Sequence, residues 1–136
     1  MNTIDRDGGL PDPAPAGMSR LRLPFGSVVD RNTSVRFTFD GKLYYGLSGD
    51  SLASALAANE VRLLSRSFKY HRPRGPVTMA GLDANTYVRV GDQPNVAADS
   101  VPIVEGLAAW PQNVFGSIRC DFASAIEWIG RFLPVG

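Results

Sequence analysis

The residues best suited to chemistry gather in one basic stretch, residues 65–76, which reads SRSFKYHRPRGP. The side chains in it that are suited to face a cofactor phosphate or the carboxylates of a partner are Arg66, Lys69, Tyr70, His71, Arg72 and Arg74. Arginine binds both phosphates and carboxylates bidentately. No acidic residue occurs from residue 61 to residue 82, so these charges must meet water, a partner or a ligand. The alternative interpretation is a solvated basic loop beside a core strand.

The single histidine of the chain, His71, lies between Tyr70 and Arg72 in this stretch and is the candidate for a general base. A general base would need an orienting carboxylate and a substrate pocket, and the sequence identifies neither. We therefore assign no catalytic residue, and expect His71 to make a structural or phosphate contact. Pro73 and Pro76 remove backbone donors, so the stretch cannot be a core strand throughout.

Composition excludes several classes of function. The 136 residues carry a formal net charge of +1, which offers no broad basic face for nucleic acid. No apolar run approaches the roughly 18 residues of a membrane span, and residues 1–16 lack the apolar segment of a secretory signal. The single cysteine, Cys120, excludes an intrachain disulfide and a metal site of several cysteines. We expect a cytoplasmic protein.

The elements that must position the basic stretch begin after a polar leader. Residues 1–20 predict a disordered leader, and Met18 is a candidate for the natural start. In residues 34–39 the alternation of Val35, Phe37 and Phe39 predicts a half-buried strand. Asp-Gly at 40–41 predicts a tight turn, with residues 42–46 as the returning strand.

A short helix is predicted next. Ser51 and its neighbours offer N-cap chemistry, and the apolar face consists of Leu52, Ala53, Leu56 and Ala57. A helix of about two turns is stable only when it packs on a sheet. We expect Asn59 to end it in the left-handed conformation.

The remaining pattern alternates between loops and strands. Residues 77–84 predict a loop, 86–90 a strand, 91–95 a turn, 96–98 a return strand, and 101–104 an edge strand that tolerates Pro102. Residues 106–136 are interpreted as an aromatic extension, irregular over 107–113 and helical over 122–129. Trp110 and Trp128 are expected as core or interface anchors. The sequence thus indicates an α+β fold, with a domain over residues 21–105.

The order of a hairpin, a short helix and strands around a long loop resembles the β-grasp fold of 2Fe-2S ferredoxins, whose loop cysteines follow the spacing C-x4-C-x2-C before a fourth further on. The chain is similar in layout to the small ferredoxin-like subunits of flavin-dependent amine and opine dehydrogenases. Counted from Pro-Arg-Gly at 73–75, the ligand positions of that family fall on Thr78, Asp83, Thr86 and Asp99, none of which is cysteine.

A cluster-less family provides a closer resemblance. The strings RFTFDG, GDSLASALAAN and RSFKYHRPRG occur in this order at residues 36–41, 49–59 and 66–75. They resemble the N-terminal region of the α subunit of heterotetrameric sarcosine oxidase, and the resemblance covers roughly residues 20–136. Unlike that subunit, the chain contains no G-x-G-x-x-G fingerprint of a dinucleotide-binding domain.

The resemblance implies a non-catalytic subunit or domain of a complex that oxidatively demethylates a secondary amine such as sarcosine. It implies flavoprotein partner subunits that hold FAD, FMN or NAD, and no 2Fe-2S cluster in this chain. A hard-metal site at Asp83 and Asp99 is the weaker interpretation, because ordinary surface residues would show the same pattern. The alternative function is a free-standing β-grasp protein-interaction module unrelated to amine oxidation.

Overall fold

A computed structural model describes residues 22, 25–26 and 28–119 of the chain. The elements in them are β1 (Asp30–Phe39), β2 (Lys42–Ser48), α1 (Leu52–Ala58), β3 (Ser65–Arg66), β4 (Pro73–Arg74), β5 (Tyr87–Val90), β6 (Gln93–Ala97) and β7 (Leu107–Pro111). The predicted leader, the terminal helix at 122–129, Cys120 and Trp128 lie outside the described residues. No helix among the described residues is long and apolar enough to cross a membrane.

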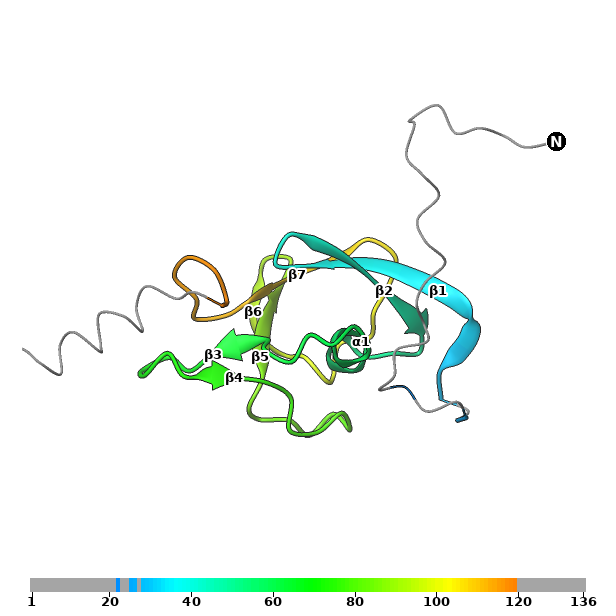
Figure 1. Ribbon diagram of the computed structural model, residues 1–136, viewed down its shortest axis with the longest axis horizontal. Coiled ribbons are helices and arrows are strands. Elements are labelled where there is room, and N and C mark those ends of the chain that lie inside the picture. The colour runs from blue at the N-terminus through cyan, green and yellow to red at the C-terminus, as the bar shows by residue number, and fades with distance from the viewer. Residues whose placement is uncertain (1–21, 23–24, 27, 120–136) are drawn as a thin grey trace, which may run out of the picture.

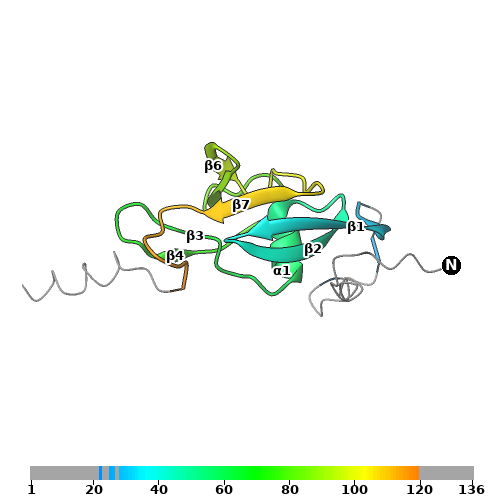
Figure 2. The same cartoon turned by 90° about the horizontal axis from the view of Figure 1, so that it is seen from above.

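One five-stranded sheet forms the body of the molecule, in the order β2-β1-β7-β5-β6 (Figure 1). The two central strands, β1 and β7, run parallel, whereas the other neighbouring pairs are antiparallel. The single helix α1 crosses one face of this sheet, as the view from above shows (Figure 2). This mixed sheet grasping one helix confirms the predicted α+β fold of the β-grasp type.

The β1–β2 hairpin forms where the alternating pattern predicts it. Val35, Phe37 and Phe39 are all buried, on the sheet face that meets the core. The turn places Asp40 at φ 52° and Gly41 at φ 72°, which are the left-handed conformations that a type I′ hairpin turn requires. A one-residue change of register would expose every phenylalanine of β1, so apolar burial determines the pairing.

Helix α1 begins at the predicted cap, because the Ser51 hydroxyl accepts a hydrogen bond from the backbone N–H of Ser54 at 3.2 Å. Its buried residues are Leu52, Ala53, Ala55 and Leu56. The prediction for Asn59 was wrong: Asn59 keeps φ −90°, and Glu60 takes the left-handed conformation at φ 62°. The Asn59 amide instead donates to the carbonyls of Tyr45 and Ala55, both at 2.7 Å, so a tertiary contact holds Asn59 in that conformation.

The largest departure from the prediction is strand β7. Residues 107–113 were expected to be irregular, but Leu107–Pro111 forms the strand between β1 and β5. Its sequence, LAAWP, lacks β-branched residues and ends in proline, so its local strand preference is weak. Parallel pairing of Leu107 with Phe37 and of Ala109 with Phe39 compensates for this. The sheet therefore continues beyond residue 105, where the sequence analysis ended the domain.

Two smaller predictions on this side of the molecule were also wrong. Residues 101–104 form no strand; one isolated bridge joins Pro102 to Ser51, and the backbone N–H of Leu52 donates to the Val101 carbonyl at 2.7 Å. The segment thus satisfies the amino end of α1 instead of extending the sheet. The turn predicted at 91–95 is shorter, because β6 already begins at Gln93.

Candidate functional site: the β3–β4 ribbon and the loop that follows it

The basic stretch folds as a two-stranded ribbon, β3–β4, in which Ser65 pairs with Arg74 and Arg66 with Pro73. In Figure 1 the ribbon projects to one side of the sheet. Its tip, residues 67–72, is closed by Ser67, whose backbone N–H donates to the Arg72 carbonyl at 2.9 Å and whose hydroxyl accepts from the Arg72 N–H at 3.0 Å. The stretch is therefore an ordered projection, which the sequence did not predict.

Arg66 does not face outward as expected. Its side chain is buried, and its guanidinium donates to the carbonyl of Ile118 at 3.1 and 2.9 Å and to the carbonyl of His71 at 2.8 Å. Backbone carbonyls at these distances satisfy a buried guanidinium by charge-assisted hydrogen bonds. Arg66 thus joins the ribbon to the segment after β7, and is removed from the set of partner-facing residues.

His71 lies at the same junction. Its Nδ1 is 3.2 Å from the Asn113 carbonyl, and its ring lies 5.6 Å from that of Phe115. The backbone of His71 has φ 47°, and its N–H donates to the Ser67 carbonyl. These contacts give His71 a structural role at the junction between the ribbon and the segment after β7.

The other cations stay outside. Lys69 and Arg72 are exposed, and both place their charge over the Tyr70 ring, at 5.2 and 5.0 Å from its centroid. Arg74 is half-buried, with its guanidinium at 3.2 Å from the Asn85 side-chain oxygen. Cation–π contacts with Tyr70 order two flexible cations without neutralising them. The tip therefore presents a fixed positive charge to anything that docks there.

The loop from Gly75 to Thr86 contains three of the four positions that matched cluster ligands. Asp83 is buried and accepts hydrogen bonds from the backbone N–H groups of Val77 at 3.1 Å and Asn85 at 2.7 Å. The Asp83 N–H in turn donates to the Asp99 carboxylate at 2.9 Å. Both carboxylates are 5% exposed, so the expectation of ordinary surface residues was wrong. They accept hydrogen bonds from the loop's backbone amides, which would otherwise be buried without partners.

The remaining two ligand positions have different surroundings. Thr78 is half-buried, and its hydroxyl accepts from the Ala80 N–H at 3.2 Å. The Thr86 side chain is completely buried, and its hydroxyl has no hydrogen-bond partner among the described residues. Among the described residues there is no group of three or more His, Cys, Asp or Glu side chains placed to hold a metal ion.

A 2Fe-2S cluster is held by four thiolates, and these residues do not fit one. All four matching positions carry oxygen side chains, and Asp83 and Asp99 are already engaged with backbone amides. The hydroxyls of Thr78 and Thr86 are not soft ligands of the kind that iron–sulfur centres select.

Sequence reasoning missed three supporting residues. Asn85 donates from its amide to the Gly75 carbonyl at 2.8 Å, which closes the neck of the loop. Gly75 has no room for a side chain, since a Cβ there would collide with the Arg62 carbonyl oxygen. Asn113 donates to the Arg66 carbonyl at 3.0 Å. The sequence signal for Asn85 was its position two residues after Asp83 in a loop that contains glycine. No local pattern indicated a role for Asn113.

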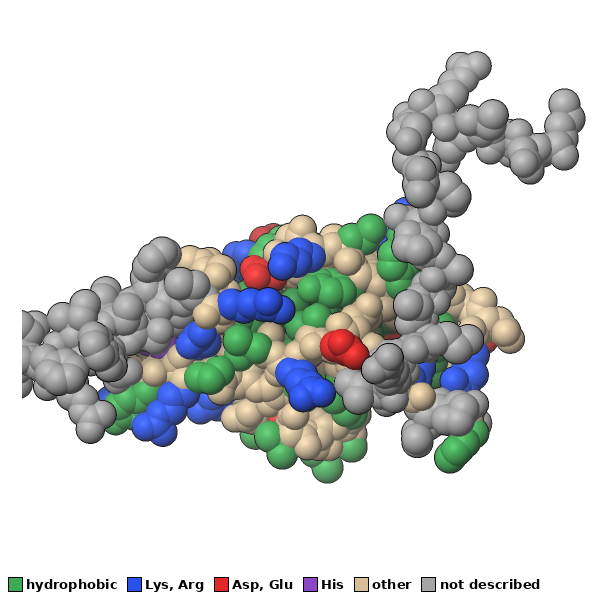
Figure 3. Space-filling view, viewed as in Figure 1, with side chains coloured by type: hydrophobic (Ala, Val, Ile, Leu, Met, Phe, Trp, Pro, Cys, Tyr) green, Lys and Arg blue, Asp and Glu red, His purple; other side chains and the backbone are tan. Residues whose placement is uncertain are grey.

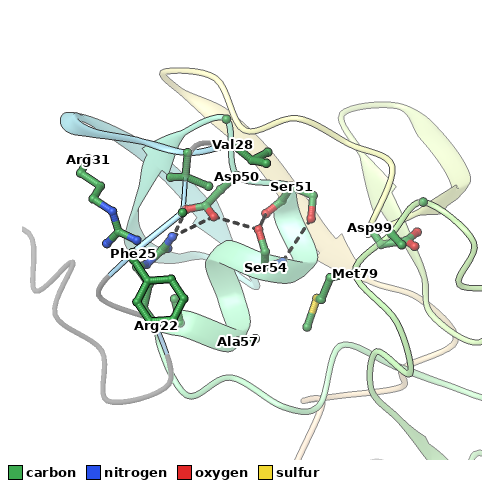
Figure 4. Close-up of a pocket in the computed structure, with 16 residues that line it drawn as sticks. Arg22, Phe25, Val28, Arg31, Asp50, Ser51, Ser54, Ala57, Met79 and Asp99 are labelled. Carbon is green, nitrogen blue, oxygen red and sulfur yellow. Dashed lines mark hydrogen bonds and ion pairs between the residues drawn. The ribbon is translucent and has the colours of Figure 1, made fainter.

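A cavity of about 710 Å³ lies on the other side of the loop, beside α1 (Figure 4). At its edge the Arg22 guanidinium donates to both oxygens of buried Asp50, at 3.0 and 2.6 Å. Asp50 also accepts from the Leu47 N–H and the Ser54 hydroxyl, each at 2.9 Å. The sequence placed Asp50 in a segment with turn and N-cap chemistry, without predicting its pairing with Arg22. These contacts use both oxygens of Asp50, so it serves as an anchor for the amino end of α1.

Comparison with known proteins gives three consistent results. Residues 32–114 match a family described as the 2Fe-2S iron-sulfur cluster binding domain. Sarcosine oxidase subunit alpha of Rhizobium meliloti (strain 1021) is 45% identical over 123 residues, which cover 88% of this chain and 12% of that protein. The subunit of the same name from Corynebacterium sp. (strain P-1) is 32% identical over 88 residues, covering 60% of this chain and 9% of its own length.

Among solved structures, the crystal structure of L-proline dehydrogenase from P. horikoshii superposes with a TM-score of 0.52 at 26% identity, over 61% of this chain and 16% of that one. The chain thus spans at most 16% of the length of each of these relatives. Because the matched residues 32–114 contain the whole described sheet from residue 32 onward, with the ribbon and the loop, the chain belongs to the family of 2Fe-2S iron-sulfur cluster binding domains.

Proposed function

We propose that the chain is a non-catalytic subunit or domain of a flavin-dependent, sarcosine-oxidase-like complex that oxidatively demethylates a secondary amine, and we assign this complex to the cytoplasm. Support comes from the 45% identity to a sarcosine oxidase α subunit and from the structural likeness to a proline dehydrogenase. Both names denote oxidation of an amine.

The observation that carries this proposal is the ordered positive tip of the ribbon. Lys69 and Arg72 are exposed, while Tyr70 holds both in place from between them. Buried Arg66 fixes the base of the ribbon. A pre-organised cationic tip loses little conformational entropy on binding, so it suits the acidic surface or the cofactor phosphate of a flavoprotein partner.

The cofactors belong to the partner subunits in this proposal: FAD, FMN or NAD are held there, and this chain holds no 2Fe-2S cluster. The oxygen side chains at all four ligand positions support that assignment. Iron and acid-labile sulfide measured after anaerobic purification of the full chain provide the test. We expect neither above background, and stoichiometric amounts of both would reject the assignment.

The role of the tip is tested with the double variant Lys69→Gln, Arg72→Gln in the tagged full chain, purified from its native host. Each lost charge-assisted contact is expected to weaken association by about 1.5–3 kcal/mol, while the melting temperature stays unchanged because both side chains are exposed. The matched control is Lys42→Gln, Arg89→Gln, which removes two exposed cations from the sheet. The measurements are bound flavin per chain and amine oxidation.

Loss of flavoprotein in the tip variant alone would support the proposal. Equal assembly and activity in both variants would reject the role of the tip. If the wild-type chain binds a stable partner that contains no flavin, the free-standing interaction module becomes the better description.

A further inference from the structure

We propose that the 75–86 loop, the segment that carries three of the four cluster-ligand positions, is an apolar docking surface bordered by arginines, and that its occupant is a flavoprotein polypeptide with an apolar patch bordered by carboxylates. The inference rests on the proposed function and adds to it a second contact surface. This surface differs from the tip of the ribbon in its chemistry, because its centre is apolar whereas the tip is positively charged.

The loop exposes large apolar side chains to water. Val77 is 80% exposed, Leu82 82% and Met79 44%. Figure 3 shows hydrophobic side chains along the lower end of the molecule, where Figure 1 places the loop after β4. Single exposed apolar residues are ordinary on protein surfaces, but three within six residues of one loop form a patch of the kind that marks interaction sites.

The backbone beneath these side chains is tied at both ends. The Asp83 carboxylate holds the N–H of Val77 at one end and that of Asn85 at the other. The Asn85 amide closes the neck on the Gly75 carbonyl, and Asp99 holds the N–H of Asp83 from a different part of the chain. A loop tied in this way offers its apolar side chains in one arrangement, so docking orders little that is mobile.

The border of the surface is positive. Gly75 lies directly against the Arg62 carbonyl, which places exposed Arg62 at the start of the loop. Arg74 lies against Asn85 at its end. Between exposed Glu60 and buried Asp83 the sequence contains no acidic residue. In Figure 3 Lys and Arg side chains lie above and beside the apolar end, with an acidic side chain next to the upper of them. Charge complementarity therefore selects carboxylates on the partner.

A second copy of this chain is a poorer occupant, because it would bring an equally positive border against the first. A nucleic acid would match the charge but would leave Val77, Met79 and Leu82 without an apolar counterpart. A large polypeptide partner satisfies both requirements. The matched part covers 12% of the sarcosine oxidase subunit alpha of Rhizobium meliloti, so most of that relative's chain lies outside the match.

The test uses the tagged full chain in its native host, with the double variant Val77→Ser, Leu82→Ser. The matched control, Leu43→Ser, Val104→Ser, removes two exposed apolar side chains from β2 and from the 101–106 segment, outside the proposed surface. We expect both variants to have the melting temperature of the wild-type chain. The docking variant should retain about tenfold less co-purifying flavoprotein, measured as flavin per chain, because apolar contacts at the centre of an interface dominate its affinity.

The outcomes separate the two proposals. A loss confined to the docking variant supports the surface. If both variants retain as much flavin per chain as the wild type, the docking surface is rejected and the proposed function is unaffected. Equal loss in both variants also overturns it, because the effect would not be specific to the loop. A wild-type chain that purifies without any flavoprotein overturns the proposed function and this inference with it.

Discussion

The side of the molecule formed by the β1–β2 hairpin and α1 is held together differently from the side formed by the ribbon and the 75–86 loop. On the first, Phe37, Phe39 and Leu56 are buried against one another in a continuous apolar cluster. On the second, the buried charged groups are Arg66, Asp83 and Asp99, and each is hydrogen-bonded to backbone atoms. The first side gains its stability from area removed from water, whereas the second depends on hydrogen bonds that direct where its surface points.

The 75–86 loop is held by its own polar groups, because the Asp83 carboxylate accepts from the backbone N–H groups of Val77 and Asn85. The backbone of this loop is held mainly by polar contacts between residues close in sequence. The sheet that supports it is held by apolar contacts between residues distant in sequence. The two sides should therefore respond differently to substitution.

The largest effect is expected for Leu56→Ala, which opens a cavity in the apolar side. Leu56 is completely buried at the centre of the helix face. We expect a loss of about 2–5 kcal/mol in the free energy of unfolding, from lost transfer energy and the residual cavity. Chemical denaturation of the full chain measures it. A loss below about 1 kcal/mol would show that this side does not depend on apolar burial as described.

The polar side should respond to Asp83→Ala, which removes the acceptor of two backbone amides. We expect a loss of about 1–3 kcal/mol, because buried N–H groups are left without partners. Hydrogen exchange should become faster at Val77 and Asn85, while the amides of β1 stay protected. Asp92→Asn, in the exposed turn after β5, is the control and should change neither quantity. Uniform loss of protection across the sheet would contradict a local role for Asp83.

Thr86→Val should act in the opposite direction. The Thr86 hydroxyl is buried without a hydrogen-bond partner among the described residues, so an isosteric apolar side chain relieves a desolvation cost. We expect a gain of about 1 kcal/mol in the free energy of unfolding. Thr78→Val is the matched variant; it removes an acceptor for the Ala80 N–H and should be slightly destabilising. Destabilisation by Thr86→Val would indicate a partner for its hydroxyl.

The smallest effect is expected at an exposed ion pair that belongs to neither side. The backbone N–H of Arg36, and then its guanidinium, donate to Glu105 and hold the pKa of that carboxyl below its usual value of 4.5. A lowered folded-state pKa contributes stability that is present above the unfolded-state pKa and is lost as the pH falls through the folded-state pKa. Below pH 4.5 the difference in stability between the wild type and Glu105→Gln should therefore shrink.

Stability measured against pH for these two proteins checks the sign of this effect. Both groups of the pair are more than half exposed, so solvent screening keeps the contribution small. A difference that grows as the solution is acidified would contradict the direction of the pKa shift.

The elements that were predicted correctly are those specified by neighbours in the chain. Alternation in β1, Asp-Gly in the turn and Ser51 before α1 each act over a few residues, and all three appear as expected. The candidate site was predicted less well. Its exposed cations, Lys69 and Arg72, lie where the sequence placed them, whereas Arg66 in the same stretch is buried. Nothing in the local pattern distinguishes these three cations. Arg66 alone is hydrogen-bonded to a residue more than forty positions away, Ile118, and that contact buries it.

By itself, then, the sequence determined the hairpin, the short helix, the family resemblance and the absence of thiolates at the ligand positions, since each is a property of residue type and short spacing. Tertiary structure decided the rest. Leu107–Pro111 is a central strand because β1 and β5 leave a gap with free backbone groups on both sides. Arg66 turns inward because the Ile118 carbonyl lies within reach. Asp83 and Asp99 are buried because loop amides 77, 83 and 85 need acceptors. Strand β7, the inward turn of Arg66 and the contact of Asp99 with the Asp83 amide all satisfy backbone groups of segments distant in sequence, a requirement that no local pattern records.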